Sequence, residues 1–91
     1  MSTIDIQRTH DAGLERARET VDKTAQRMRE KFGAQTEWQG NVLHFRRSGI
    51  DGTIAVGAQT VQVNARLGML LSALRPMIEQ EIRRSLDEQF G

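Results

Sequence analysis

Apolar and polar residues alternate along five short segments of the chain, with the period of two that is typical of strands with one buried face. These segments cover residues 2–9, 34–39, 42–47, 53–58 and 61–67. Short links join the last four, and the first of these links, Gly40-Asn41, matches a hairpin turn. We therefore expect the second to fifth strands to form an antiparallel meander.

Residues 48–52, with the sequence Ser-Gly-Ile-Asp-Gly, are predicted to form the turn between the third and fourth strands. The run also resembles part of a phosphate-binding loop. It lacks the lysine and the following hydroxyl residue of that loop, however, and it lies between two strands. A turn is therefore the favoured interpretation.

A helical period follows the first strand, because apolar residues recur at steps of three and four between residues 14 and 32. The stripe consists of Leu14, Ala17, Val21, Ala25, Met28 and Phe32. Asp11 is expected to cap this helix, since its carboxylate can accept hydrogen bonds from free N–H groups of the first turn. Gly33 is the expected stop signal.

The densest apolar segment lies near the C-terminal end of the chain. It begins with Leu67, Met69, Leu70, Leu71, Ala73 and Leu74, and it continues at a spacing of four with Ile78, Ile82, Leu86 and Phe90. Pro76 lacks a backbone donor and disfavours helical geometry at Arg75. We therefore expect a short helical turn, a break near Arg75, and then the main helix.

Sorting the strand residues by alternation gives the predicted sheet two different faces. The apolar face carries Ile4, Ile6, Trp38, Leu43, Phe45, Ile54, Val56, Val61, Val63 and Leu67. The polar face carries Asp5, Gln7, Gln35, Glu37, His44, Arg46, Gln62, Asn64 and Arg66. We predict an α+β fold with β-α-β-β-β-β-α order, in which both helices cover the apolar face of a mainly antiparallel sheet.

Length and composition agree with one ordered domain over residues 1–91, with 37% hydrophobic and 27% charged residues. The formal net charge of +1 is too small to favour binding to nucleic acid. The chain has no cysteine, which excludes disulfides and thiol chemistry and favours the cytoplasm. Neither a signal-peptide pattern nor a membrane-spanning apolar run is present, so we expect a cytoplasmic protein without a transmembrane segment.

Three basic residues, Lys23, Arg27 and Lys31, lie four apart on the polar side of the first predicted helix. A solvated surface is the favoured interpretation of this row. A docking patch for an acidic partner is the alternative.

Candidates for catalytic or metal chemistry are few. His44 is the best of them, and it shares the predicted polar sheet face with Arg46 and Arg66. A lone histidine on an exposed strand is more often an ordinary surface residue than a catalyst. The other histidine, His10, is expected to belong to the turn before the first helix. No metal site or cofactor is predicted, because the two histidines have no ligand partners at a metal-binding spacing.

Trp38 and Phe45 are predicted to form a core pair on adjacent strands. Stacking on nucleic-acid bases would need these rings on the exposed face, which would require a one-residue slip of the second strand.

The apolar segment before the last helix contains more large side chains than two helices can easily bury beneath a small sheet. Core filling is the simpler interpretation, but a surplus would form an exposed patch suited to dimerisation or to an apolar particle. The candidate residues for such a surface are Met69, Leu70, Leu71, Leu74, Met77 and Ile78.

Three stretches together resemble a known family: His10-Asp11-Ala12-Gly13-Leu14; the run from Glu37-Trp38-Gln39-Gly40 to Gly49-Ile50-Asp51-Gly52; and Leu67-Gly68-Met69-Leu70-Leu71-Ser72-Ala73-Leu74 leading into Glu81-Ile82-Arg83-Arg84. The chain is similar over essentially its whole length to the small polyhydroxyalkanoic acid system proteins. This resemblance implies a cytoplasmic bacterial protein of storage-polyester metabolism that acts at the polyester granule or beside its enzymes. It brings no catalytic residue set with it.

The leading hypothesis is therefore a non-catalytic accessory protein of the polyhydroxyalkanoate system that contacts granules or granule-associated proteins through the apolar segment. The alternative is a small-ligand or enzymatic domain with a pocket between sheet and helices and with His44 or Arg66 at its mouth. A homodimer joined through helices or sheet edges is a third possibility.

Overall fold

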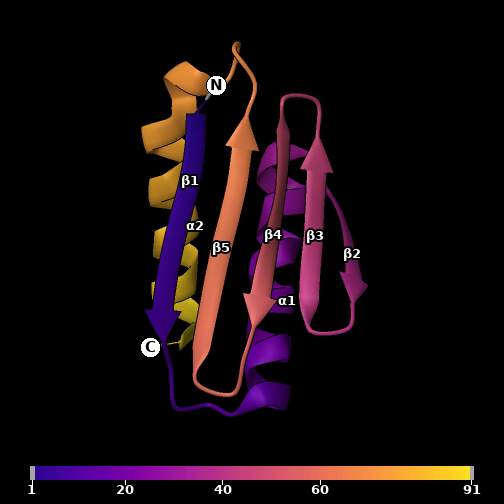
Figure 1. The fold of residues 1–91 in the computed structure, drawn as a ribbon, viewed down its shortest axis with the longest axis vertical. Helices are drawn as coiled ribbons and strands as arrows, with labels where there is room; N and C mark the ends of the chain where they lie inside the picture. Colours follow the sequence, from indigo (N-terminus) through magenta and orange to yellow (C-terminus); the bar gives the residue numbers. More distant parts are fainter. Residues whose placement is uncertain (1, 91) are drawn as a thin grey trace.

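A computed structural model describes residues 2–90 of the chain. The elements follow the order β1 (Ser2–Thr9), α1 (Leu14–Phe32), β2 (Gln35–Gln39), β3 (Val42–Arg47), β4 (Ile50–Val56), β5 (Thr60–Leu67), a 3₁₀ turn η1 (Ser72–Leu74) and α2 (Arg75–Phe90). The five strands form one antiparallel sheet in the order β1-β5-β4-β3-β2. Both helices lie behind the sheet in Figure 1, which confirms the predicted α+β fold and its element order.

The core lies between the sheet and the helices. Every residue assigned to the apolar face by alternation faces this layer; Trp38, on the edge strand β2, is half-buried, and the other nine are buried. From the helices, Ala17, Val21, Ala25, Met28, Ile78, Ile82 and Leu86 complete the core. The opposite face of the sheet has no helix over it in Figure 1, as predicted.

The turn between β3 and β4 is shorter than predicted. It consists of Ser48 and Gly49, and β4 begins at Ile50, whose side chain is buried. Gly52, which was expected to belong to the turn, lies inside β4 directly opposite Phe45. A Cβ atom at residue 52 would lie 2.5 Å from Cζ of Phe45 and 2.5 Å from the Asn64 carbonyl oxygen. Glycine is therefore needed here for close packing within a strand, and not for a turn.

The start of α1 also differs from the prediction that Asp11 caps it. The N-cap residue is Gly13, and no side chain caps the helix. His10 organises this link instead, because its Nδ1 accepts a hydrogen bond from the Ala12 N–H at 3.1 Å and its Nε2 bonds to the Gly57 carbonyl at 3.0 Å. The expected role of His10 in the turn is thus confirmed.

The ends of the other helical segments agree with the sequence. Gly33 adopts the left-handed conformation, with φ of 65°, and its N–H bonds to the Arg29 carbonyl. Pro76 occupies the second position of α2, where its missing N–H removes no helical hydrogen bond. The short turn η1 precedes α2, as predicted. The expected break near Arg75 is wrong, because η1 leads directly into α2 and Arg75 itself is helical, with φ of −50° and ψ of −48°.

Two residues of the basic row on α1 form ion pairs within the molecule. Lys31 Nζ lies 2.5 Å from Oε1 of Glu81, and Arg27 lies 2.8 Å from Oε2 of Glu88, both on α2. In the same helix–helix interface, the buried hydroxyls of Thr24 and Ser85 are 3.3 Å apart. Lys23 and Lys31 are exposed, so the row is largely a solvated surface, as favoured. Through Arg27 and Lys31 it also helps to join the two helices.

Candidate apolar tip

A loop between β5 and η1 projects from one end of the molecule and carries two large exposed apolar side chains. Met69 is 87% exposed and Leu70 is 93% exposed, and Leu74 and Met77 on the following turns are 41% and 54% exposed. We call these four residues the apolar tip. Figure 1 shows this link at the upper end of the longest axis, between the end of β5 and the start of α2.

The backbone of the loop is held by hydrogen bonds although its side chains are exposed. The Gly68 N–H donates to the Gly49 carbonyl at 2.8 Å, and the Gly68 carbonyl accepts from the N–H groups of Leu71 and Ser72 at 3.1 and 3.0 Å. The Ser72 hydroxyl donates to the same carbonyl at 3.1 Å. The exposed side chains therefore stand on an ordered turn.

Leu71 and Ile78, the other two predicted members of the apolar surface, point inward. Ile78 is 4% exposed and belongs to the core. Leu71 is half-buried and packs against the core, with its side chain over Gly49. A Cβ atom at residue 49 would lie 2.8 Å from Leu71 Cδ1, and Gly49 has a φ of 88°. Leu71 thus anchors the loop that presents Met69 and Leu70.

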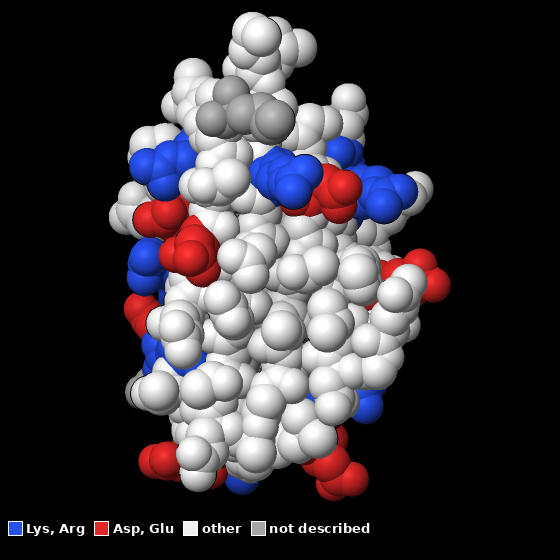
Figure 2. Space-filling view, in the orientation of Figure 1, with Lys and Arg blue, Asp and Glu red and all other residues white. Residues whose placement is uncertain are grey.

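The three predicted polar-face residues lie on the open side of the sheet, away from the helices. His44 is directly opposite Glu37 on one side and Thr53 on the other. Arg46 and Arg66 both lie opposite Asp51, in a row nearer the apolar tip. Figure 2 shows charged side chains in a band toward the upper end of this face and a broad uncharged area below it.

This placement bears on the alternative hypothesis of a pocket between sheet and helices. His44 and Arg66 cannot stand at the mouth of such a pocket, because their side chains are on the opposite face of the sheet. The hollow between the helices, beside Thr24 and Ser85, measures only about 10 Å³. Within residues 2–90, His44 forms no side-chain hydrogen bond or ion pair that would orient it for catalysis.

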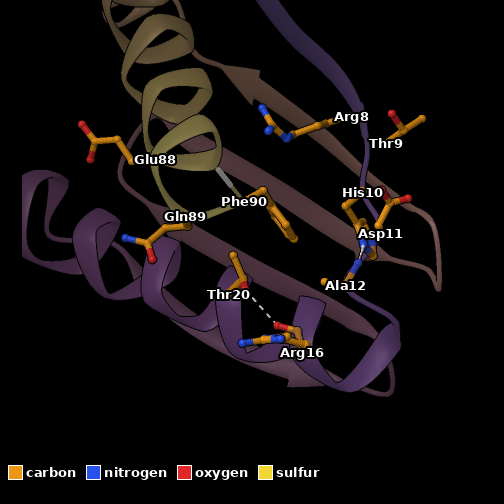
Figure 3. A pocket seen from close by; sticks show the side chains of 10 residues that line it. All are labelled: Arg8, Thr9, His10, Asp11, Ala12, Arg16, Thr20, Glu88, Gln89 and Phe90. Atoms are coloured by element: carbon orange, nitrogen blue, oxygen red, sulfur yellow. Dashed lines mark hydrogen bonds between the residues drawn. The ribbon is translucent and has the colours of Figure 1, made fainter.

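An open cleft of about 580 Å³ lies at the end of the molecule opposite the tip (Figure 3). His10 stacks on Phe90 there, with ring centroids 5.1 Å apart, and the Arg8 guanidinium lies 5.8 Å from the Phe90 ring centroid. Both nitrogens of His10 are engaged by the backbone groups described above. We interpret this cluster as the packing that joins the β1–α1 link to the end of α2.

Two features of the apolar tip could not be predicted from the sequence. The support that Gly49 and Leu71 give each other depends on β4 and β5 being neighbours, which no local pattern reveals. The same pairing brings Asp51 and Arg66 together beside the tip.

Comparison with known families supplies the biological context of this fold. The family model of the polyhydroxyalkanoic acid system proteins (PHA_gran_rgn) matches residues 4–90. The chain belongs to this family. The match covers the sheet, both helices and the apolar tip, so the family relationship applies to the whole described domain. No curated protein and no solved structure matched the chain.

None of the helices within residues 2–90 is long and apolar enough to cross a membrane.

Proposed function

We propose that this member of the polyhydroxyalkanoic acid system family is a non-catalytic accessory protein of the cytoplasm that binds the storage-polyester granule surface through its apolar tip. The observation that carries the proposal is the exposure of Met69 and Leu70 on a hydrogen-bonded turn. Transfer of a large apolar side chain from water into an apolar surface is favourable by roughly 1.5–3 kcal/mol when the side chain is fully buried. The family relationship supports polyester as the relevant material.

Binding of the purified protein to isolated polyester granules tests this proposal. Met69→Glu with Leu70→Glu should weaken binding by at least about 10-fold, because each glutamate replaces a buried apolar contact with a charge. A matched control adds two glutamates on the open sheet face, as Gln39→Glu with Gln62→Glu; both residues are exposed. Equal binding by the wild type and a folded tip variant would show that the apolar tip is not the binding surface.

Leu71 is left unchanged in this variant because it supports the turn. Circular dichroism and thermal unfolding should show that both double variants keep the fold. This separates loss of the surface from loss of structure.

A second copy of the chain is the competing occupant of the tip. Sedimentation of the wild type at increasing concentration distinguishes the two, since the monomer has a mass of 10.3 kDa. The granule proposal predicts that the tip variant and the wild type have the same sedimentation behaviour. A dimer that dissociates in the tip variant would instead assign this surface to self-association.

A further inference from the structure

The charged residues around the tip have a different balance from those at the opposite end of the molecule. Six charged side chains lie next to the tip, at the ends of β3 and β5, the start of β4 and the start of α2: Arg46, Arg47, Arg66, Arg75, Asp51 and Glu79. At the other end, where β1 and α2 finish and α1 begins, the carboxylates of α2 are paired, Asp87 with Arg8 and Glu88 with Arg27 and Arg84. The group next to the tip has a net charge of +2, although the total charge of the molecule is only +1.

The excess positive charge beside the tip is not neutralised within the described part of the chain. Arg47 donates hydrogen bonds to the carbonyl oxygens of Phe32 and Ser48, which are neutral acceptors. Arg66 forms no ion pair with any residue in 2–90, and the contact between Arg46 and Asp51 is a long one of 3.9 Å between exposed groups. Of the four arginines, Arg75 alone has a close carboxylate, Glu79 at 3.1 Å.

An apolar projection with an excess of arginines beside it matches a surface that is apolar beneath and anionic on top. A bare polyester is uncharged and would make no use of the arginines. We infer that the tip docks end-on onto a lipid surface with anionic headgroups, with Met69 and Leu70 inserted among the acyl chains and the arginines beside the headgroups. This inference rests on the proposed function, because it uses the same tip, and it names the class of molecule that the tip meets first.

Shape supports the end-on orientation. The molecule measures 37 × 22 × 20 Å, and the tip lies at one end of the longest dimension (Figure 1). The positively charged group beside the tip then faces the anionic surface, which lowers the electrostatic free energy of this orientation relative to the reverse one.

Co-sedimentation with lipid vesicles tests the inference. The wild type is compared on neutral phosphatidylcholine vesicles and on vesicles with about 30 mol % phosphatidylglycerol, at about 0.05 and 0.5 M salt. We expect binding to the anionic vesicles that falls as salt rises. Arg46→Gln with Arg66→Gln should weaken it by about 10- to 30-fold, since each arginine near an anionic surface contributes several-fold in affinity.

The control, Arg16→Gln with Arg84→Gln, removes the same charge far from the tip. Each pair combines one arginine without an ion pair in residues 2–90 and one exposed, ion-paired arginine. The control should stay within about twofold of the wild type, because neither residue lies beside the tip. Any of three results would overturn the inference. The wild type does not bind anionic vesicles, it binds neutral vesicles as tightly as anionic ones, or both double variants lose the same amount of affinity.

The outcomes also separate this inference from the proposed function. One outcome is that the protein binds bare polyester through Met69 and Leu70, that Arg46→Gln with Arg66→Gln does not affect this binding, and that anionic vesicles are not bound. This outcome would support the proposed function and contradict the inference of a lipid surface. Binding to anionic vesicles without binding to granules would support the lipid surface and contradict the proposed granule binding.

Discussion

Phe45 and Gly52 show how one pair of residues sets the local structure of the sheet. They lie directly opposite each other on β3 and β4, and the Phe45 ring occupies the space that a side chain at residue 52 would need. Phe45 is 1% exposed, so this ring is a central part of the core. The glycine is thus part of the packing of an aromatic residue on the neighbouring strand.

Gly52→Ala should therefore lower the free energy of unfolding by about 1–3 kcal/mol, because the added methyl group overpacks the site. Urea unfolding measures this cost. In a Phe45→Leu background the same substitution should cost less, since the smaller side chain leaves more room. An equal cost in both backgrounds would show that the ring is not the cause.

At the scale of elements, the two helices are joined by charge as well as by apolar packing. Lys31 and Glu81 form an ion pair across the interface, and their hydrogen bond, with the Lys31, Arg84 and Arg27 charges, holds the pKa of Glu81 below its ordinary value of 4.5. Desolvation acts in the opposite direction but does not prevail. Because the folded state favours the ionised carboxylate, the pair stabilises the fold above the unfolded-state pKa.

This contribution should be lost as the pH falls from above 4.5 through the lowered pKa of folded Glu81. Glu81→Gln removes the titration, so its stability should change less than that of the wild type over this acidic interval. Denaturant unfolding at a series of pH values measures the difference. Glu19→Gln, an exposed change on the outer side of α1, serves as the control and should retain the wild-type pH dependence.

At the scale of the whole molecule, the apolar tip and the single tryptophan lie at different places, so fluorescence from each place can show whether that place contacts a binding surface. Trp38 lies on the edge strand β2, where Arg18 stacks over its ring at 4.7 Å and Asp22 accepts the bond from its Nε1 at 3.0 Å. Leu70 is at the end of the long axis. End-on docking therefore changes the surroundings of residue 70 and leaves those of residue 38 as they are.

In a Trp38→Phe background, Leu70→Trp places the only tryptophan on the tip. Its fluorescence should shift to shorter wavelength when granules or anionic vesicles are added, because the indole leaves water. The wild-type emission, which comes from Trp38, should stay unchanged and is the control. A shift of Trp38 without a shift at residue 70 would mean that another face of the molecule binds.

Local patterns in the sequence were sufficient for the element order, the two faces of the sheet, the left-handed glycine after α1 and the turn before Pro76. These features depend on residues close together in the chain, through periodicity, glycine geometry and the missing proline donor. They also raised an apolar surplus before α2 as the alternative to core filling. Of the six candidate residues, Met69, Leu70, Leu74 and Met77 are exposed, whereas Leu71 and Ile78 pack inward.

Contacts between distant residues decided the rest. Leu71 and Ile78 are apolar like their neighbours, and only the position of Gly49 and of the core turned them inward. The acidic partners of Lys31 and Arg27 lie fifty or more residues away, and the arginines beside the tip come from β3, β5 and α2. The sequence by itself thus determined which segments fold and which of them has the densest run of apolar side chains. The tertiary structure decided which of those side chains are exposed and which charges surround them, because both depend on strand order and helix docking, which local periodicity does not specify.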